Sequence, residues 1–163
     1  TSPKPYTRDK RSPEPANETV SKYMRSNRST NTKPEIRLRK AMWQAGMRGY
    51  RLHWKKAPGK PDIAFPGKKL AIFMNGCFWH RCPYCKLRMP KNNADFWKTK
   101  FARNVERDQE KLNALHADGW QTLVIWECQI KKNIDAQIYR IMSSLLLAFN
   151  SRTHRTGNLT PNP

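Results

Sequence analysis

The chain has 163 residues, with 32 Lys or Arg against 12 Asp or Glu, which gives a formal net charge of +20. This length favours a single domain, and a charge of this size destabilises a compact fold unless a polyanion screens it, so we expect nucleic acid as the partner. No apolar run reaches the roughly 18 residues of a membrane span and no apolar signal core opens the chain, so we expect no membrane partner and a cytoplasmic location.

The first 50 residues predict an arm followed by a helix. Residues 1–20 combine prolines and charges with scarcely an apolar side chain, which predicts a disordered basic arm. Thr32-Lys33-Pro34-Glu35 is a capping box with proline in the first turn, and it predicts a helix that ends at Gly46. We expect the folded domain to span residues 21–150 and the polar residues 151–163 to form a disordered tail.

Three strands are expected next. Residues 50–54 alternate apolar and polar side chains, which is typical of a half-buried strand. Residues 63–65 form a short apolar run after a proline-rich turn. Residues 70–74 are apolar throughout, which indicates a central strand that is covered on both faces.

The second half predicts a long helix over residues 95–116, a buried strand over 120–126 and an amphipathic helix over 136–149. The complete order, αβββαβα, predicts an α/β fold. Its middle reproduces the αβββαβ core of the restriction-endonuclease-like nucleases. Two neighbouring strands would then bring the residues that follow 74 and 126 to one end of the sheet.

Five possible metal ligands lie beyond those two strand ends: Cys77, His80, Cys82, Cys85 and Cys128. Clustered cysteines in a reducing compartment favour a metal over disulfides, and the Cys82-x-x-Cys85 spacing suits tetrahedral zinc. Either all four cysteines bind, or His80 replaces one and leaves a free thiol beside the metal. We favour the four-cysteine set, which closes the coordination sphere and makes the zinc structural.

Three further residues are candidates for catalysis. Asp62 precedes a short strand, where restriction-type nucleases place a carboxylate that binds Mg²⁺, although aspartate in a Pro-Asp turn usually caps its own backbone. Glu35 belongs to the capping box, or it supports a metal site. His80, if it is free of zinc, would take the proton from an attacking water. Many restriction-type nucleases use a lysine for this role, and the strand continues here as Asn75-Gly76-Cys77 without one.

Aromatic and polar residues around the long helix suggest DNA contacts. Phe78 and Trp79 are either core residues or groups that stack on bases, because adjacent bulky rings in a polar loop cannot both point inward easily. Asn104 and Asp108 interrupt an apolar stripe of the helix. Each needs a hydrogen-bond partner if it is buried, or a ligand if this end of the helix is a site. On the first alternative Asp108 would pair with a neighbouring arginine, and on the second Asn104 and Lys100, one turn apart, would contact base edges.

Together these features resemble the very short patch repair (Vsr) DNA mismatch endonucleases of bacteria, over residues 21–132. The resemblance rests on the following motifs: Ser21-Lys22-x-Met24-Arg25, Glu35, Gly59-x-Pro61-Asp62, Gly76-Cys77-Phe78-Trp79-His80, Phe96-Trp97, Asn104-Val105-Glu106-Arg107-Asp108, Gly119-Trp120 and Trp126-Glu127-Cys128. It implies a restriction-endonuclease-like α/β/α sandwich with a central mixed sheet and a structural zinc. It also implies a monomer that uses Mg²⁺ to nick double-stranded DNA 5′ of the thymine in T:G mismatches, leaving a 5′-phosphate, in the repair of deaminated 5-methylcytosine.

The resemblance also implies roles for individual residues. Asp62 matches a metal-binding aspartate, His80 a general base and Glu35 a glutamate that supports the site. The four cysteines fall on or beside zinc ligands. The implied DNA contacts are Arg25, the wedging aromatics Phe78, Trp79 and Trp97, and Lys100 and Asn104, which would face the mismatched pair.

Met74-Asn75 departs from the family pattern, since the best-studied members carry Thr-His there. The threonine position serves Mg²⁺ through its backbone carbonyl, which Met74 retains, and Asn75 takes the catalytic position of the histidine without its charge. A cysteine also stands where a histidine zinc ligand is found. Two alternatives remain: a defence or restriction nuclease of the same fold without mismatch specificity, and a zinc-dependent DNA-binding module without catalysis. The family function implies a bacterial enzyme associated with the nucleoid.

Overall fold

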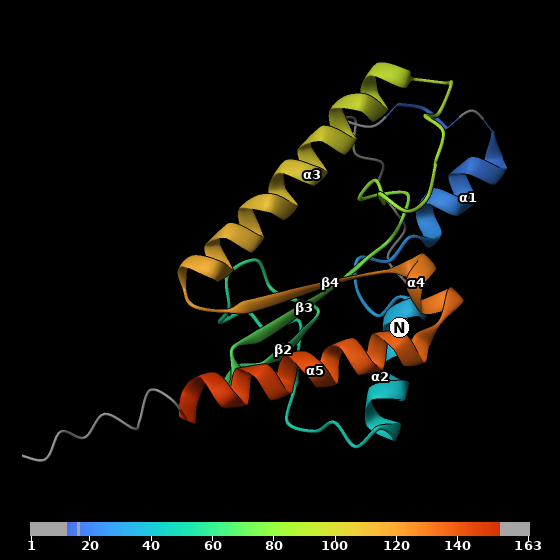
Figure 1. Cartoon of the computed structure of the whole chain (residues 1–163). Helices are drawn as coiled ribbons and strands as arrows, with labels where there is room; N and C mark the ends of the chain where they lie inside the picture. The colour runs from blue at the N-terminus through green and yellow to red at the C-terminus, as the bar shows by residue number, and fades with distance from the viewer. Residues whose placement is uncertain (1–12, 16, 154–163) are drawn as a thin grey trace, which may run out of the picture.

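The computed structural model describes residues 13–15 and 17–153, and its centre is a four-stranded mixed sheet in the order β1-β2-β3-β4 (Figure 1). The strands are β1 (Arg51–Leu52), β2 (Ile63–Phe65), β3 (Leu70–Asn75) and β4 (Gln121–Trp126). β2 pairs antiparallel with both β1 and β3. β3 and β4 pair parallel and in register to their last residues, Asn75 and Trp126, so both strands end at the same edge.

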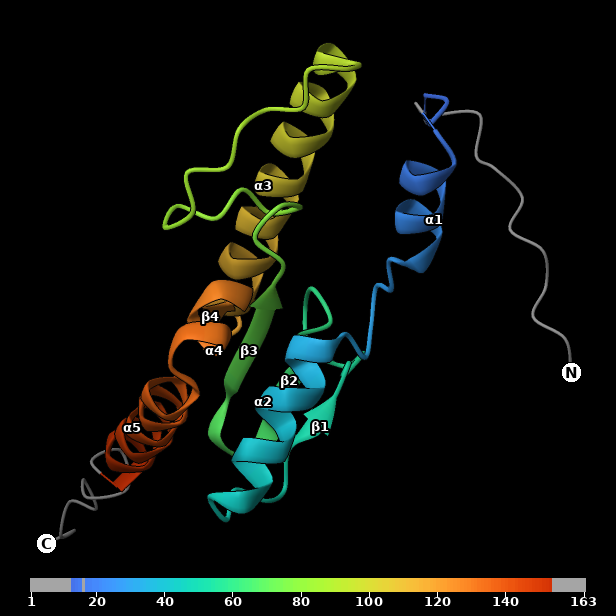
Figure 2. The same ribbon diagram turned by 90° about the vertical axis from the view of Figure 1, so that its right-hand side faces the viewer.

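Helices cover both faces of this sheet. The described helices are α1 (Glu18–Ser26), α2 (Lys33–Gln44), the 3-10 helix η1 (Pro66–Lys68), α3 (Ala94–Ala117), α4 (Glu127–Lys132) and α5 (Ile134–Thr153), and all except α1 adjoin the sheet (Figure 2). On one face, α2 and α5 share an apolar core with Ile72 and alternate residues of β3. On the other face, Leu115 of α3 packs with Phe73 and its neighbours. The result is the predicted three-layer α/β/α arrangement, and it explains why β3 is apolar throughout.

The sequence predictions are largely confirmed for the central elements. The predicted N-cap starts α2: the Thr32 hydroxyl accepts a hydrogen bond from the Glu35 N–H, and helix residues run from Lys33 to Gln44. The Glu35 carboxylate bonds to the Asn31 N–H and the Thr32 hydroxyl instead of the Thr32 N–H that a full capping box would use. β2 has its predicted bounds, and β3 is an inner strand. The strand predicted over 50–54 was too long, because the strand residues are Arg51–Leu52 and one further backbone bond to the β2 side follows, from His53.

Two short α-helices were not predicted. α4 follows β4 directly, so Cys128 lies in a helical turn rather than at a strand end. α1 begins at Glu18, inside the arm predicted over residues 1–20, and the Asn17 side chain caps it by accepting a bond from the Val20 N–H at 2.9 Å. α1 has no buried residue and stands away from the sheet (Figure 2).

Parts of the two predicted termini lie outside the described residues, namely 1–12 and 16 of the arm and 154–163 of the tail. α5 extends through Thr153, beyond the predicted end of the last helix. Within the described part of the chain, no helix is both long enough and apolar enough to cross a bilayer.

Candidate active site and cysteine cluster

The four cysteines meet beyond the parallel ends of β3 and β4. Their four sulfur atoms all lie within 4.8 Å of one another, and they belong to Cys77, Cys82, Cys85 and Cys128. The Cys82 and Cys128 sulfurs are 3.7 Å apart, close to the roughly 3.8 Å edge of a tetrahedron with 2.3 Å Zn–S bonds. Backbone bonds tie the loop together, since the Cys82 N–H donates to the Cys77 carbonyl and the Cys128 N–H to the Cys77 sulfur. The cluster could therefore hold one tetrahedral metal ion.

His80 is not part of the cysteine cluster but contacts the long helix α3. Its Nδ1 forms a short hydrogen bond with Asp108 Oδ2, and the other carboxylate oxygen accepts a bond from Lys111 Nζ at 3.4 Å. Burial alone would raise the pKa of Asp108, but the bond to His80 and the charge of Lys111 hold it below its ordinary value. An ionised Asp108 keeps the proton on Nδ1 and leaves Nε2 as the free acceptor. The prediction that Asp108 pairs with an arginine was wrong.

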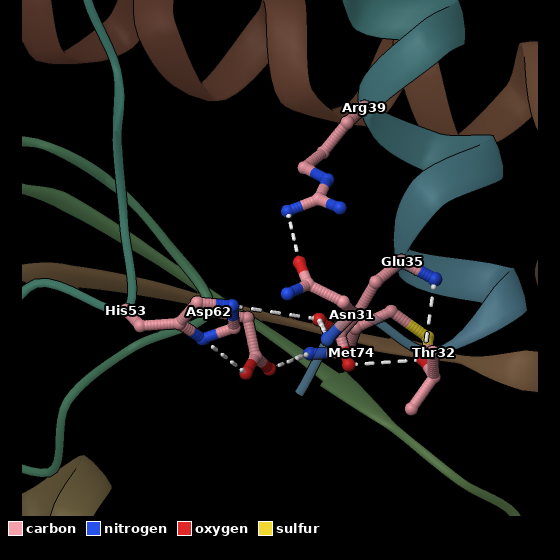
Figure 3. A network of polar contacts seen from close by, with 7 residues as sticks. All are labelled: Asn31, Thr32, Glu35, Arg39, His53, Asp62 and Met74. Carbon is pink, nitrogen blue, oxygen red and sulfur yellow. Dashed lines mark hydrogen bonds and ion pairs between the residues drawn. The ribbon is translucent and has the colours of Figure 1, made fainter. Parts of the chain in front are cut away.

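A second polar group surrounds Asp62 (Figure 3). Asp62 precedes β2, and its Oδ2 accepts a hydrogen bond from the Met74 N–H at 2.8 Å. In an extended strand the N–H and C=O of one residue point to the same side, so the Met74 carbonyl also faces the Asp62 side of β3. This is the place that the sequence assigned to Mg²⁺.

Glu35 lies in the same group and is almost completely buried. Its two carboxylate oxygens accept hydrogen bonds at 2.9 Å, one from the Asn31 N–H and the other from the Thr32 hydroxyl. Asn31 in turn accepts a bond from the Arg39 guanidinium. Glu35 therefore helps to hold the start of α2 and also stands beside Asp62 (Figure 3); its supporting role at a metal site stays a prediction.

His53 completes this group and was not predicted. Its Nδ1 lies 3.7 Å from Asp62 Oδ1, and its Nε2 lies 3.8 Å from Glu35 Oε2. The sequence pattern treated it only as a polar position of an alternating strand. The chain instead turns there with a φ of +44°, which no spacing rule would have indicated.

The groups around Asp62 could hold a cation. Burial, joined by the nearby carboxylate of Glu35, raises the pKa of Asp62 to about 6, although the Met74 N–H acts in the opposite direction. His53 Nε2 is buried and has no hydrogen-bond partner among the described residues. Two carboxylates, a backbone carbonyl and an unpartnered imidazole nitrogen form a donor set that suits a divalent ion.

Asn75 lies at the His80 side of the site. It lines a small cavity of about 30 Å³ together with Asp108 and Lys111, enough room for about one water molecule. The aliphatic part of Lys111 passes directly under Gly59, where an added Cβ would lie 2.6 Å from Lys111 Cγ. Gly59 also has a φ of +70°, so both space and backbone conformation favour glycine there.

The aromatic residues form one cluster between the 76–80 loop and α3. Phe78 contacts Trp79, Trp97 and Phe101, with ring centroids 5.1 to 5.5 Å apart. Trp97 and Phe101 are buried, whereas Phe78 and Trp79 are half-buried. The Lys100 ammonium lies 5.4 Å from the Trp79 ring.

Two predicted DNA contacts have other neighbours in this structure. The Asn104 side chain donates to the Trp79 carbonyl at 2.9 Å and accepts from Arg107, so it positions the aromatic loop. Arg25 lies on the exposed helix α1, where its guanidinium bonds to the Ser21 hydroxyl. Arg25 is thus separated in the fold from the cluster that contains the other five predicted contacts.

Comparisons with known proteins identify similar sequences and folds. The family model described as "DNA mismatch endonuclease Vsr" matches residues 14–86. The chain is 44% identical over 108 residues to the type II nicking enzyme V.XorIIP of Xanthomonas oryzae pv. oryzae, covering 66% of this chain and 78% of that protein. It is 34% identical over 113 residues to the DNA mismatch endonuclease Vsr of Escherichia coli, and the match covers 69% of this chain and 72% of that protein. The catalytic domain of the homing endonuclease I-Bth0305I has a similar fold, with a TM-score of 0.50 at 22% identity over 72% of this chain and 98% of that one.

Proposed function

The chain belongs to the Vsr family of DNA mismatch endonucleases and is a DNA endonuclease, and we propose that it nicks one strand of double-stranded DNA 5′ of the thymine in a T:G mismatch. The nick would leave a 5′-phosphate and begin repair of deaminated 5-methylcytosine, in the bacterial cytoplasm at the nucleoid and with the protein as a monomer. The observation that carries the proposal is that strand β3 connects the proposed metal site to the proposed base. Met74, near the end of β3, is hydrogen-bonded to Asp62, and the loop that follows β3 holds His80 against Asp108.

His80 is the proposed general base. Asp108 holds the imidazole by Nδ1, so Nε2 is free to take the proton from the attacking water, and the same carboxylate stabilises the imidazolium that results. Asn75 and Lys111 line the small cavity beside Asp108, where we propose that they hold a water molecule close to the base.

Asp62 and the Met74 carbonyl would hold Mg²⁺, since hard oxygen donors are the ligands that this ion prefers. When bound, the ion would supply positive charge to the phosphate and to the leaving oxygen. Glu35 already receives hydrogen bonds at both oxygens, so we assign it a supporting role beside Asp62. The four cysteines would hold a structural zinc that fixes the loop carrying His80.

Mismatch selection is assigned to the aromatic cluster. A T:G pair costs less to open than a matched pair, and a base that stacks on an aromatic ring gains about 1–3 kcal/mol. Phe78 and Trp79 are half-buried and would meet the DNA, whereas Trp97 is 8% exposed and would support them from below. Lys100 and Asn104 adjoin the Trp79 ring and backbone, respectively, and would face the opened pair. Arg25 would contact the backbone of the duplex from α1.

The direct test is nicking of otherwise identical duplexes that contain one T:G or one T:A pair, with Mg²⁺ present. We expect nicking on the thymine strand of the T:G duplex alone, and none with the Asp62→Asn variant. Equal nicking of both duplexes would support the second candidate, a defence or restriction nuclease of this fold. That candidate is favoured by the packing of Phe78, Trp79 and Trp97 against one another, because this packing alone gives the rings a structural role.

A further inference from the structure

His53 is the one member of the Asp62 group that has no role in the proposed mechanism. Its backbone N–H donates to the Asp62 carbonyl at 3.0 Å, which extends the pairing of β1 with β2 by one residue. The left-handed turn at His53 then places the imidazole between two carboxylates (Figure 3). Three anchored residues therefore surround one small space: Asp62 before β2, Glu35 on α2 and His53 after β1.

The distances distinguish two roles for this imidazole. A charged histidine that neutralises two carboxylates forms hydrogen bonds of about 2.7–2.9 Å. His53 instead keeps its nitrogens 3.7 Å from Asp62 and 3.8 Å from Glu35. Two atoms that bind one ion at about 2.1 Å can lie no more than about 4.2 Å apart, and His53 Nε2 and Glu35 Oε2 meet this limit. One ligand atom each from Glu35, His53 and Asp62 lie within 4.8 Å of one another. The contacts of His53 are therefore too long for hydrogen-bonded ion pairs, and the spacing leaves room for an ion beside Nε2 and Asp62.

The state of Nε2 supports the same conclusion. This nitrogen is buried and lacks a hydrogen-bond partner among the described residues, and an unsatisfied buried polar atom costs free energy unless a ligand occupies it. Glu35 and Asp62 cannot move to meet it without breaking their bonds to Asn31, Thr32 and Met74. The three donors are thus held apart at fixed positions.

We propose that His53 is a third protein ligand of the ion held by Asp62, binding through Nε2, and that it gives the site a preference for Mn²⁺ or Co²⁺ over Mg²⁺. Imidazole nitrogen favours transition-metal ions, whereas carboxylate and carbonyl oxygens alone favour Mg²⁺. This inference rests on the proposed metal site at Asp62, and it adds both a ligand and a selectivity that the family resemblance does not assign.

The test measures Mn²⁺ binding to the whole zinc-loaded chain without DNA. Calorimetry gives the affinity, and pulsed electron paramagnetic resonance reports the ligands. The latter detects a ¹⁴N nucleus bonded directly to Mn²⁺. His53→Asn is the informative variant, because asparagine tolerates a positive φ and its amide is too short to reach the ion. The matched controls are His80→Gln and His116→Gln, which remove the other two described histidines. Melting temperature and zinc content establish that each variant is folded.

Wild-type protein should show a directly bonded ¹⁴N signal that His53→Asn loses and both control variants keep. Removing a ligand should weaken Mn²⁺ binding by at least the 10- to 100-fold typical of lost supporting contacts, and it should lower the ratio of Co²⁺ to Mg²⁺ affinity. A ¹⁴N signal that is absent from wild type or survives in His53→Asn, with binding that still depends on Asp62, would overturn this inference alone. Mn²⁺ binding unchanged by Asp62→Asn would instead overturn the proposed metal site.

Discussion

Replacing Asp62 with asparagine should abolish nicking and yet stabilise the protein when divalent ions are absent. The substitution keeps the shape of the side chain and an oxygen that can accept the Met74 N–H, but it removes the negative charge. Burial, aided by Glu35, raises the pKa of Asp62 from 3.8 to about 6, so the folded protein disfavours the ionised form.

The magnitude follows from this shift in pKa. A rise of about two units corresponds to roughly 3 kcal/mol, at 1.36 kcal/mol per unit. The Asp62 side chain is 21% exposed, and the asparagine amide also costs free energy to bury, so we expect a gain of about 1–3 kcal/mol in the free energy of unfolding. For a domain of this size that is a rise of about 3–10 °C in melting temperature.

The pH dependence has a definite sign. Below pH 3.8 Asp62 is protonated in both folded and unfolded protein, so the variant gains nothing. Between pH 3.8 and about 6 ionisation occurs first in the unfolded chain, and wild-type stability falls as pH rises. Above that window the advantage of the variant is constant.

Urea unfolding of both proteins across this pH range measures the difference, in buffer passed over a chelating resin rather than containing a chelator. Any zinc released at low pH is released from both proteins, so the difference between them still reports Asp62. Added Mg²⁺ should then stabilise wild type and leave the variant unchanged. A variant that is no more stable than wild type at pH 7, or one whose advantage persists at pH 3, would refute the reasoning.

Four other predictions concern single residues. His80→Ala should abolish nicking and keep both DNA affinity, within about tenfold, and zinc content, because phosphate contacts dominate binding; loss of zinc would show that it is a ligand. Cys128→Ser should lower zinc content and melting temperature together, as elemental analysis and calorimetry would show. Trp79→Ala should reduce the ratio of T:G to T:A nicking rates with little change in the T:A rate. Gly59→Ala should destabilise the fold by about 1–3 kcal/mol by strain at a positive φ and by a clash with Lys111, measured by urea unfolding.

Local sequence patterns predicted the framework of this protein well. The capping box at Thr32 and the unbroken apolar run of β3 each depend on neighbouring residues alone, and both were placed correctly. α4 was missed because its six residues, Glu127–Lys132, are too few to show a helical period. α1 was missed because it buries nothing, so no apolar stripe marks it.

The residues of the candidate site also fall into those that local patterns predicted and those that they could not. The four cysteines adjoin two predicted strands or the helix that follows one, so their meeting followed from the strand order. The place of Met74 beside Asp62 came from the family resemblance alone. Asp108 was noticed as a polar break in an apolar helix face, but its partner His80 lies 28 residues away along the chain, and spacing cannot reveal such a pair. His53 depends on a left-handed turn that only the packed chain imposes.

His80 lies three residues after Cys77 and two before Cys82, so the proposed base occupies a loop that the cysteine cluster closes at both ends. A nuclease that acts on its own chromosome is hazardous while it is half assembled. If the thiolates bind zinc as proposed, a newly made chain would have no fixed histidine until they had taken up the metal, and zinc supply would become a step in enzyme maturation. Oxidants that convert the thiolates to sulfenic acids or disulfides would release the metal and leave the histidine unfixed. Oxidative stress that damages DNA would therefore also inactivate this enzyme.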